Sequence, residues 1–110
     1  MYDILFKPFS IAENQAPNRL VAQAMEINNA ENNGSAGQDI LERYNSLARG
    51  GWGVVFSEAI YISETHLERK RGLILNRNTL DSFKQLVDSF KNINDTSLFL
   101  FQLTHSGRRA

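Results

Sequence analysis

Three short, nearly continuous apolar runs alternate along the chain with two segments in which apolar residues recur at helical spacing. The apolar runs cover residues 19–25, 52–57 and 97–103. Their length and continuity are typical of strands that are buried on both faces, as in a parallel sheet. The order of these segments predicts strand, helix, strand, helix, strand.

Both predicted helices carry an apolar face and recognisable end signals. The first begins near Gln38, stops at Gly50 and Gly51, and its apolar face comprises Ile40, Leu41, Tyr44, Leu47 and Ala48. The second begins after a cap at Asn78 or Thr79, ends at 92–95, and its apolar face comprises Leu80, Phe83, Leu86, Val87 and Phe90. We expect these faces, with Trp52, Phe56, Phe99 and Phe101, to form a core between helices and sheet.

The remaining segments are predicted to be irregular. Residues 1–17 form an extended entry piece that closes in a turn at 14–17, and residues 18–110 hold the alternating elements. The Asn-rich stretch 26–37 favours a loop, because Asn side chains hydrogen-bond the nearby backbone. Residues 58–78 have no clean periodicity and are predicted to be a long loop.

Alternating strands and helices predict an α/β fold with a parallel sheet, either doubly wound or closed as a barrel. No glycine-rich turn follows the first strand, so the dinucleotide-binding fingerprint is missing there. Polar or small residues follow all three strands, namely Gln23, Glu26, Glu58, Ala59, Gln102 and His105. In a barrel these strand ends form the active-site face.

Composition narrows the class further. The chain has 110 residues, enough for one small domain, and 12 basic residues balance 12 acidic ones. This balance argues against a nucleic-acid-binding protein, and the apolar runs are too short to span a membrane. With no cysteine, a disulfide scaffold is excluded and a cytoplasmic location is compatible.

Several motifs, in order and at similar spacing, resemble the old yellow enzyme family of NADH:flavin oxidoreductases. They are Leu5-Phe6-x-Pro8, 17–21 (PNRLV), 48–55 (ARGGWGVV), 57–59 (SEA) and, as the most specific, 102–108 (QLTHSGR). The resemblance covers nearly the whole chain. It implies the N-terminal part of an FMN-binding (β/α)₈ TIM barrel, since a complete barrel takes about 250 residues.

The resemblance also implies which residues contact the cofactor. Those that match flavin-contacting positions are Gln23, Ala24, Met25, Glu26, Ala59 and Gln102, while Thr104 matches a substrate-pocket position. An amide such as that of Gln102 offers both a donor and an acceptor to the pyrimidine edge. The family usually has Pro at position 24 and Thr or Cys at position 26, and an anionic Glu26 would disfavour the anionic reduced flavin.

By resemblance, the implied function is an FMN-dependent oxidoreductase that takes hydride from NADH or NADPH and passes it to an activated alkene or another small-molecule acceptor. The family's substrate-binding pair, proton-donating Tyr and phosphate loops match no residue up to Ala110. We therefore expect this chain to supply one wall of the flavin site, and expect self-association or a missing C-terminal portion to complete it. The alternative is a truncated, non-catalytic remnant or a self-associating βα module.

Three other groups of residues are interpreted without a catalytic role. Glu64, His66 and Glu68 lack the spacing of a helical metal site, so no metal is expected and a solvated surface is favoured. The basic run 69–71 is a weak patch that offers, at most, a contact for NAD(P)H. His105 is expected to be a buried, hydrogen-bonded structural histidine.

Overall fold

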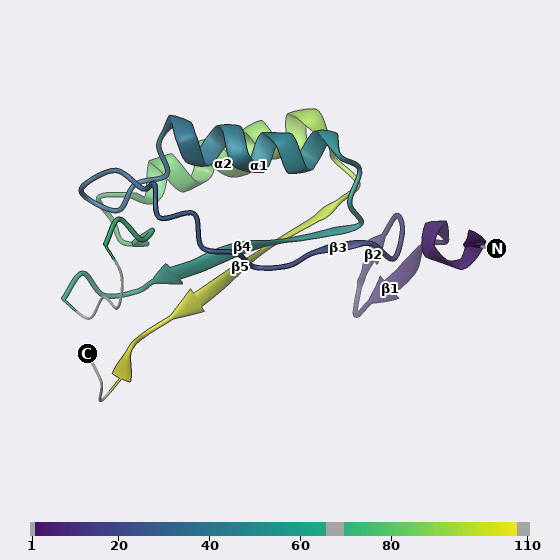
Figure 1. Cartoon of the computed structure of the whole chain (residues 1–110), viewed down its shortest axis with the longest axis horizontal. Coiled ribbons are helices and arrows are strands. Elements are labelled where there is room, and N and C mark those ends of the chain that lie inside the picture. Colours follow the sequence, from purple (N-terminus) through teal and green to yellow (C-terminus); the bar gives the residue numbers. More distant parts are fainter. Residues whose placement is uncertain (1, 66–69, 108–110) are drawn as a thin grey trace.

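The computed structural model describes residues 2–65 and 70–107 of the chain. A parallel sheet has the order β3-β4-β5, with β3 at Val21–Ala22, β4 at Val54–Tyr61 and β5 at Leu98–Thr104. Figure 1 shows α1 (Gln38–Arg49) and α2 (Leu80–Ile93) side by side over one face of this sheet. The predicted order of strands and helices is therefore confirmed, and the described sheet is open.

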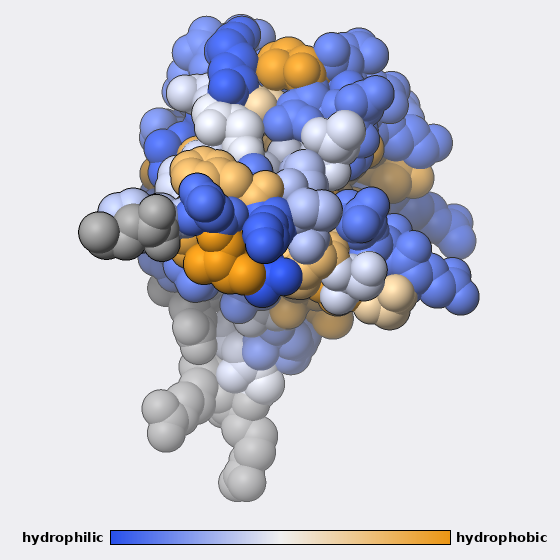
Figure 2. Space-filling model, turned by 90° about the vertical axis from the view of Figure 1, so that its right-hand side faces the viewer, coloured by the Kyte–Doolittle hydropathy of each residue, from blue (hydrophilic) through white to orange (hydrophobic). Residues whose placement is uncertain are grey.

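A small hairpin precedes this unit, at the N-terminal ends of the parallel strands. A 3-10 helix (Asp3–Phe6) leads into β1 (Phe9–Ile11) and β2 (Asn14–Ala16), which pair antiparallel. The predicted turn at 14–17 is wrong, because the chain turns at 12–13, where Ala12 has a φ of 52°. Figure 2 looks at this end of the molecule and shows apolar side chains among polar ones.

The lengths of two strands differ from the prediction. Only Val21 and Ala22 of the run 19–25 pair with β4, because the chain leaves the sheet afterwards and residues 23–26 are exposed. Conversely, β4 continues through residues 58–61, which were predicted to be loop. These residues lack a simple apolar alternation because the strand contains a bulge between Phe56 and Ala59.

The core lies between the helices and the sheet, as predicted. Phe99 of β5 packs against it, with its ring stacked on Phe90 at a centroid distance of 4.4 Å and 5.3 Å from the ring of Tyr44. Phe101 meets Phe83 of α2 edge-on at 5.8 Å. The buried helix residues are Ile40, Tyr44, Ala48, Phe83, Leu86 and Phe90. Burial of these aromatic rings ties both helices to β5.

The helix ends follow the predicted signals with two differences. After α1 only Gly51 takes a left-handed φ, of 76°, whereas Gly50 remains helical. Thr79 is the N-cap residue of α2, but its hydroxyl donates to the carbonyl of Ile74 at 2.6 Å rather than accepting from the helix. Leu80, predicted on the buried face, is 42% exposed.

The turn between α1 and β4 is fastened to the entry of β3 by one side chain. The Asn18 amide donates to the carbonyl of Gly51 at 2.8 Å, and its carbonyl oxygen accepts from the N–H of Leu20 at 3.0 Å. A Cβ on Gly53 would lie 2.2 Å from the backbone carbonyl oxygen of Asn18, so only glycine fits there. This contact aligns the first residues of β3 and β4.

Among residues 2–65 and 70–107, no helix has both the length and the apolar character needed to cross a bilayer.

Candidate functional site

A hollow of about 370 Å³ lies toward the C-terminal ends of the parallel strands. Its lining residues come from all three strand regions and are Gln23, Ala24, Phe56, Phe101 and Gln102. Val55 and Phe99 pack with the helices, so their neighbours Phe56 and Leu100 belong to the opposite face of the sheet. The hollow therefore adjoins the face that no described helix covers, at the edge where parallel strands place their functional side chains.

The bulge in β4 decides which residues accompany Gln102. Before the bulge Phe56 pairs with Leu100, and after it Ala59 pairs with Gln102, so β4 holds one extra residue. Residues in register on adjacent strands share a face, which places Ala59 beside Gln102. The bulged residues Ser57 and Glu58 are both fully buried.

Ser57 makes the hydrogen bonds that span this bulge. Its hydroxyl accepts from the backbone N–H of Gln102 at 3.1 Å and donates to the carbonyl of Glu58 at 2.8 Å. The N–H of Glu58 donates to the hydroxyl of Tyr44 on α1 at 2.6 Å. The backbone at the base of the hollow is thus held by side chains from β4 and α1.

The structure brings together some of the residues predicted for cofactor contact. Gln23, Ala24 and Gln102 line the hollow, and Ala59 lies in register with Gln102. Met25 (62% exposed) and Glu26 follow on the exposed chain after β3 and do not line it. Thr104 lies two residues beyond Gln102, half-buried and in register with Tyr61.

The chemistry of the lining is neutral. Two amide side chains stand beside one methyl group and the ring of Phe56, whereas Phe101 borders the hollow with its ring directed toward α2. None of the described residues that line the hollow carries a charge. Amides supply paired donors and acceptors, while the aromatic ring supplies a flat apolar wall. Such a lining suits a planar, uncharged ring with an amide-like edge better than it suits a phosphate.

Two residues of this site escaped the sequence analysis. Phe56 was assigned to the core under the helices, yet it lines the hollow on the other face. The alternation of Val54, Val55 and Phe56 is the signal that could have placed it there. Ser57 belongs to the motif 57–59 but was given no role of its own, because a bulge cannot be located from a single apolar run.

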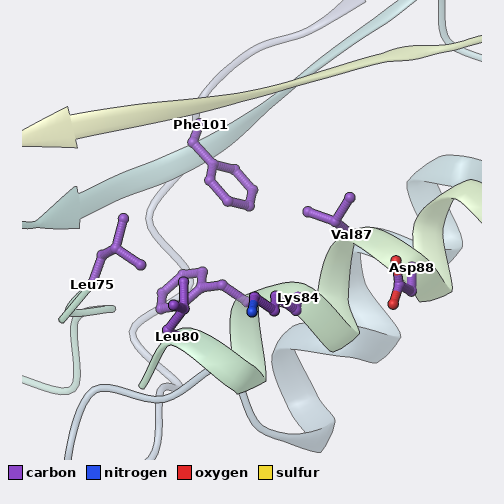
Figure 3. A pocket seen from close by; sticks show the side chains of 7 residues that line it. Leu75, Leu80, Lys84, Val87, Asp88 and Phe101 are labelled. Atoms are coloured by element: carbon purple, nitrogen blue, oxygen red, sulfur yellow. The ribbon is translucent and has the colours of Figure 1, made fainter. Parts of the chain in front are cut away.

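A second hollow, of about 360 Å³, lies on the helix-covered side of the sheet. Figure 3 shows Phe101 directed from β5 toward α2, with Leu75, Leu80 and Val87 around the space and Lys84 and Asp88 on its helix side. Because β5 is the last strand of the described sheet, this hollow lies at an open edge. An apolar space in that position can accept further apolar side chains.

The other candidate residues are only partly described. His66, Glu68, Arg69 and Arg108 lie outside the described residues. The expectation that His105 is buried is wrong: it is exposed, although its Nδ1 does accept a hydrogen bond from the N–H of Gly107 at 2.8 Å.

Known structures with a similar fold are old yellow enzymes and related reductases. The old yellow enzyme from Pichia sp. AKU4542 matches with a TM-score of 0.86 and 22% identity, over 97% of this chain and 28% of that protein. A 2-naphthoyl-CoA reductase matches with a TM-score of 0.81 and 25% identity, over 100% of this chain and 17% of that protein. Morphinone reductase matches with a TM-score of 0.79 and 21% identity, over 96% and 27%.

The chain thus spans less than a third of each of these three proteins. Comparison with curated protein sequences gives no match. A family model described as NADH:flavin oxidoreductase / NADH oxidase matches residues 4–110, which is almost the entire chain. The matched region includes both hairpin strands, the parallel sheet and the hollow. The chain therefore belongs to the NADH:flavin oxidoreductase / NADH oxidase family.

Proposed function

We propose that this chain forms one wall of the flavin site of an FMN-dependent oxidoreductase. The observation that carries the proposal is the neutral, amide-bearing hollow of about 370 Å³ at the carboxyl ends of the parallel strands. In barrels this is the end at which cofactors and substrates bind. Membership of a flavin oxidoreductase family supports FMN as the ligand.

The residues present fit the ring system of FMN rather than its phosphate. The Gln102 amide can both donate to and accept from the pyrimidine edge, and Ala59 beside it leaves room for a planar ring. Gln23 and Ala24 close the hollow from the segment after β3, and Phe56 offers an apolar surface. None of the described residues that line the hollow is a cation or belongs to a helix N-terminus that could hold a phosphate, so another part of the complete site must supply that contact.

Bound FMN would supply the hydride-transfer chemistry, accepting hydride from NADH or NADPH and donating it to an activated alkene or another small-molecule acceptor. The role of this chain is to bind and orient the ring. Met25, Glu26 and Thr104, on the strand-end segments, are proposed to extend the contacts with cofactor and substrate, Thr104 on the substrate side. A cytoplasmic location is proposed as well, in keeping with the cysteine-free sequence.

The direct test is a titration of the purified chain with FMN, followed by the quenching of flavin fluorescence. We expect saturable binding that Gln102→Ala weakens by about fivefold, since one well-placed hydrogen bond contributes roughly 1 kcal/mol. The matched control is Gln85→Ala on the exposed surface of α2, which removes an equivalent amide far from the hollow. Equal binding by wild type and Gln102→Ala would contradict the proposal.

A non-catalytic, self-associating βα module is the second candidate. The observation that favours it is the apolar hollow beside α2 at the open edge of β5 (Figure 3). Leu103, also on β5, is 56% exposed. An unpaired strand edge next to apolar side chains promotes association, either with further strands of a complete barrel or with another copy of the chain.

A further inference from the structure

The backbone beneath the candidate flavin site departs from regular strand geometry at one point. Between Phe56 and Ala59, β4 contains one more residue than β5 does between Leu100 and Gln102. In an uninterrupted register Glu58 would pair with Gln102, two residues after Phe56 and Leu100, on the same face of the sheet. The bulge replaces that pairing, so that Ala59 takes the position beside Gln102.

This replacement changes the chemistry of the hollow. A carboxylate beside Gln102 would compete for its amide N–H₂ and would place a negative charge at the ring edge. With the bulge, a methyl group stands there, and Glu58 is instead fully buried with its backbone N–H donating to Tyr44 of α1 at 2.6 Å. The bulge therefore keeps the lining neutral.

A bulge leaves backbone N–H and C=O groups without their ordinary partners on the adjacent strand, and these groups need other hydrogen-bond partners. Here the N–H of Gln102 donates to the Ser57 hydroxyl at 3.1 Å, and that hydroxyl donates in turn to the carbonyl of Glu58 at 2.8 Å. Ser57 is fully buried, so water does not compete for these bonds. One side chain thus joins the bulged strand to the residue that lines the hollow.

We propose that Ser57 is a positioning residue: its hydroxyl closes the bulge in β4 and holds Gln102 so that the amide, flanked by Ala59, meets an uncharged imide-like edge of the ligand. The role in ligand binding rests on the proposed flavin function. The hold on the backbone of Gln102 is a property of the free chain and can be tested without any ligand.

The experiment compares Ser57→Ala with Ser97→Ala as a matched control. Ser97 is also fully buried, and its hydroxyl donates to a backbone carbonyl, that of Trp52, at the opposite end of the same sheet. Two quantities are measured. One is the hydrogen-exchange rate of the backbone N–H of Gln102 in the free chain, by NMR, and the other is the affinity for FMN, by fluorescence titration.

We expect Ser57→Ala to speed exchange at Gln102 by about tenfold and to weaken FMN binding by a similar factor, as loss of one buried hydrogen bond predicts. Ser97→Ala should lower stability while changing neither quantity. Ser57→Thr, which keeps the hydroxyl, should restore both. Unchanged exchange at Gln102 in Ser57→Ala would overturn the inference.

Two further outcomes separate the inference from the proposed function. If the wild-type chain does not bind FMN, the proposed function is contradicted for this chain, and the exchange rate at Gln102 alone decides whether Ser57 holds that residue. If Ser57→Ala does not fold, Ser57→Cys keeps a side chain of similar size with a weak acceptor. If the backbone N–H of Gln102 exchanged in Ser57→Cys at the same rate as in wild type, the inference would be overturned.

Discussion

The two faces of the parallel sheet differ in what covers them and in how far their side chains are buried. On one face Val55, Ile60 and Phe99 pack under α1 and α2, where Val55 and Ile60 are fully buried and Phe99 is partly buried. On the other face Phe56 and Gln102 border a hollow and remain partly or fully exposed. The contrast indicates that the covered face supplies most of the stability of this chain, whereas the uncovered face carries the side chains of the proposed flavin site.

The largest effect is expected from the covered face. Phe90 is fully buried and stacks on Phe99 at 4.4 Å, so Phe90→Ala should lower the free energy of unfolding by about 3–5 kcal/mol. Urea denaturation followed by circular dichroism measures this loss. Phe6→Ala, at a side chain that is 65% exposed, is the control and should stay within about 0.5 kcal/mol of wild type. Similar losses in both variants would remove the contrast.

On the uncovered face, a substitution is expected to affect ligand binding more than stability. Phe56 is half-buried and lines the hollow, so Phe56→Ala should cost about 1–2 kcal/mol of stability and weaken FMN binding by about tenfold. The same denaturation curve and a fluorescence titration give both numbers. A loss of stability equal to that of Phe90→Ala, with unchanged FMN affinity, would show that the face is structural after all.

A smaller change is expected at the open edge beside α2. Leu80→Lys places a charge in the apolar hollow at a residue that is 42% exposed, so it should reduce self-association while changing stability by no more than about 0.5 kcal/mol. Sedimentation velocity over a range of concentrations measures the association. A wild-type chain that stays monomeric at every concentration counts against the self-associating module.

The smallest effect is expected at Glu26. This residue is exposed and does not line the hollow, so its proposed contact with the cofactor is peripheral and water screens its charge from the ring. Replacing it with a neutral side chain should stabilise the anionic reduced flavin slightly, and Glu26→Gln should raise the reduction potential of the FMN-bound chain by no more than about 20 mV. Spectroelectrochemical titration tests this. A rise several times larger would place Glu26 against the flavin.

The helices and the order of elements could be predicted because their signals are local. Repeated apolar spacing located α1 and α2 to within a residue or two, and the continuous apolar run located β5. The lengths of β3 and β4 could not be predicted. Pairing between strands decides them, and a bulge at Ser57 and Glu58 conceals the alternation on which a strand prediction depends.

The residues of the candidate site also divide into those that the sequence predicts and those whose place depends on strand pairing. Gln23, Ala24 and Gln102 were identified through motif resemblance, and the fold places them around one hollow. Phe56 and Ser57 were missed, because whether a strand residue faces the helices or the hollow depends on register, and the register of β4 changes at the bulge. His105 was expected to be buried, yet it directly follows the end of β5, where no described element covers it.

The position of the one tryptophan has a practical consequence. Trp52 stands just before β4, packs against the edge of the core, and its carbonyl accepts a hydrogen bond from the Ser97 hydroxyl. It is therefore an intrinsic fluorescence probe for the N-terminal end of the parallel strands, the end remote from the hollow. Its spectrum, recorded together with the emission of an added flavin, gives a two-colour readout in which unfolding and ligand release are seen as separate events in one cuvette.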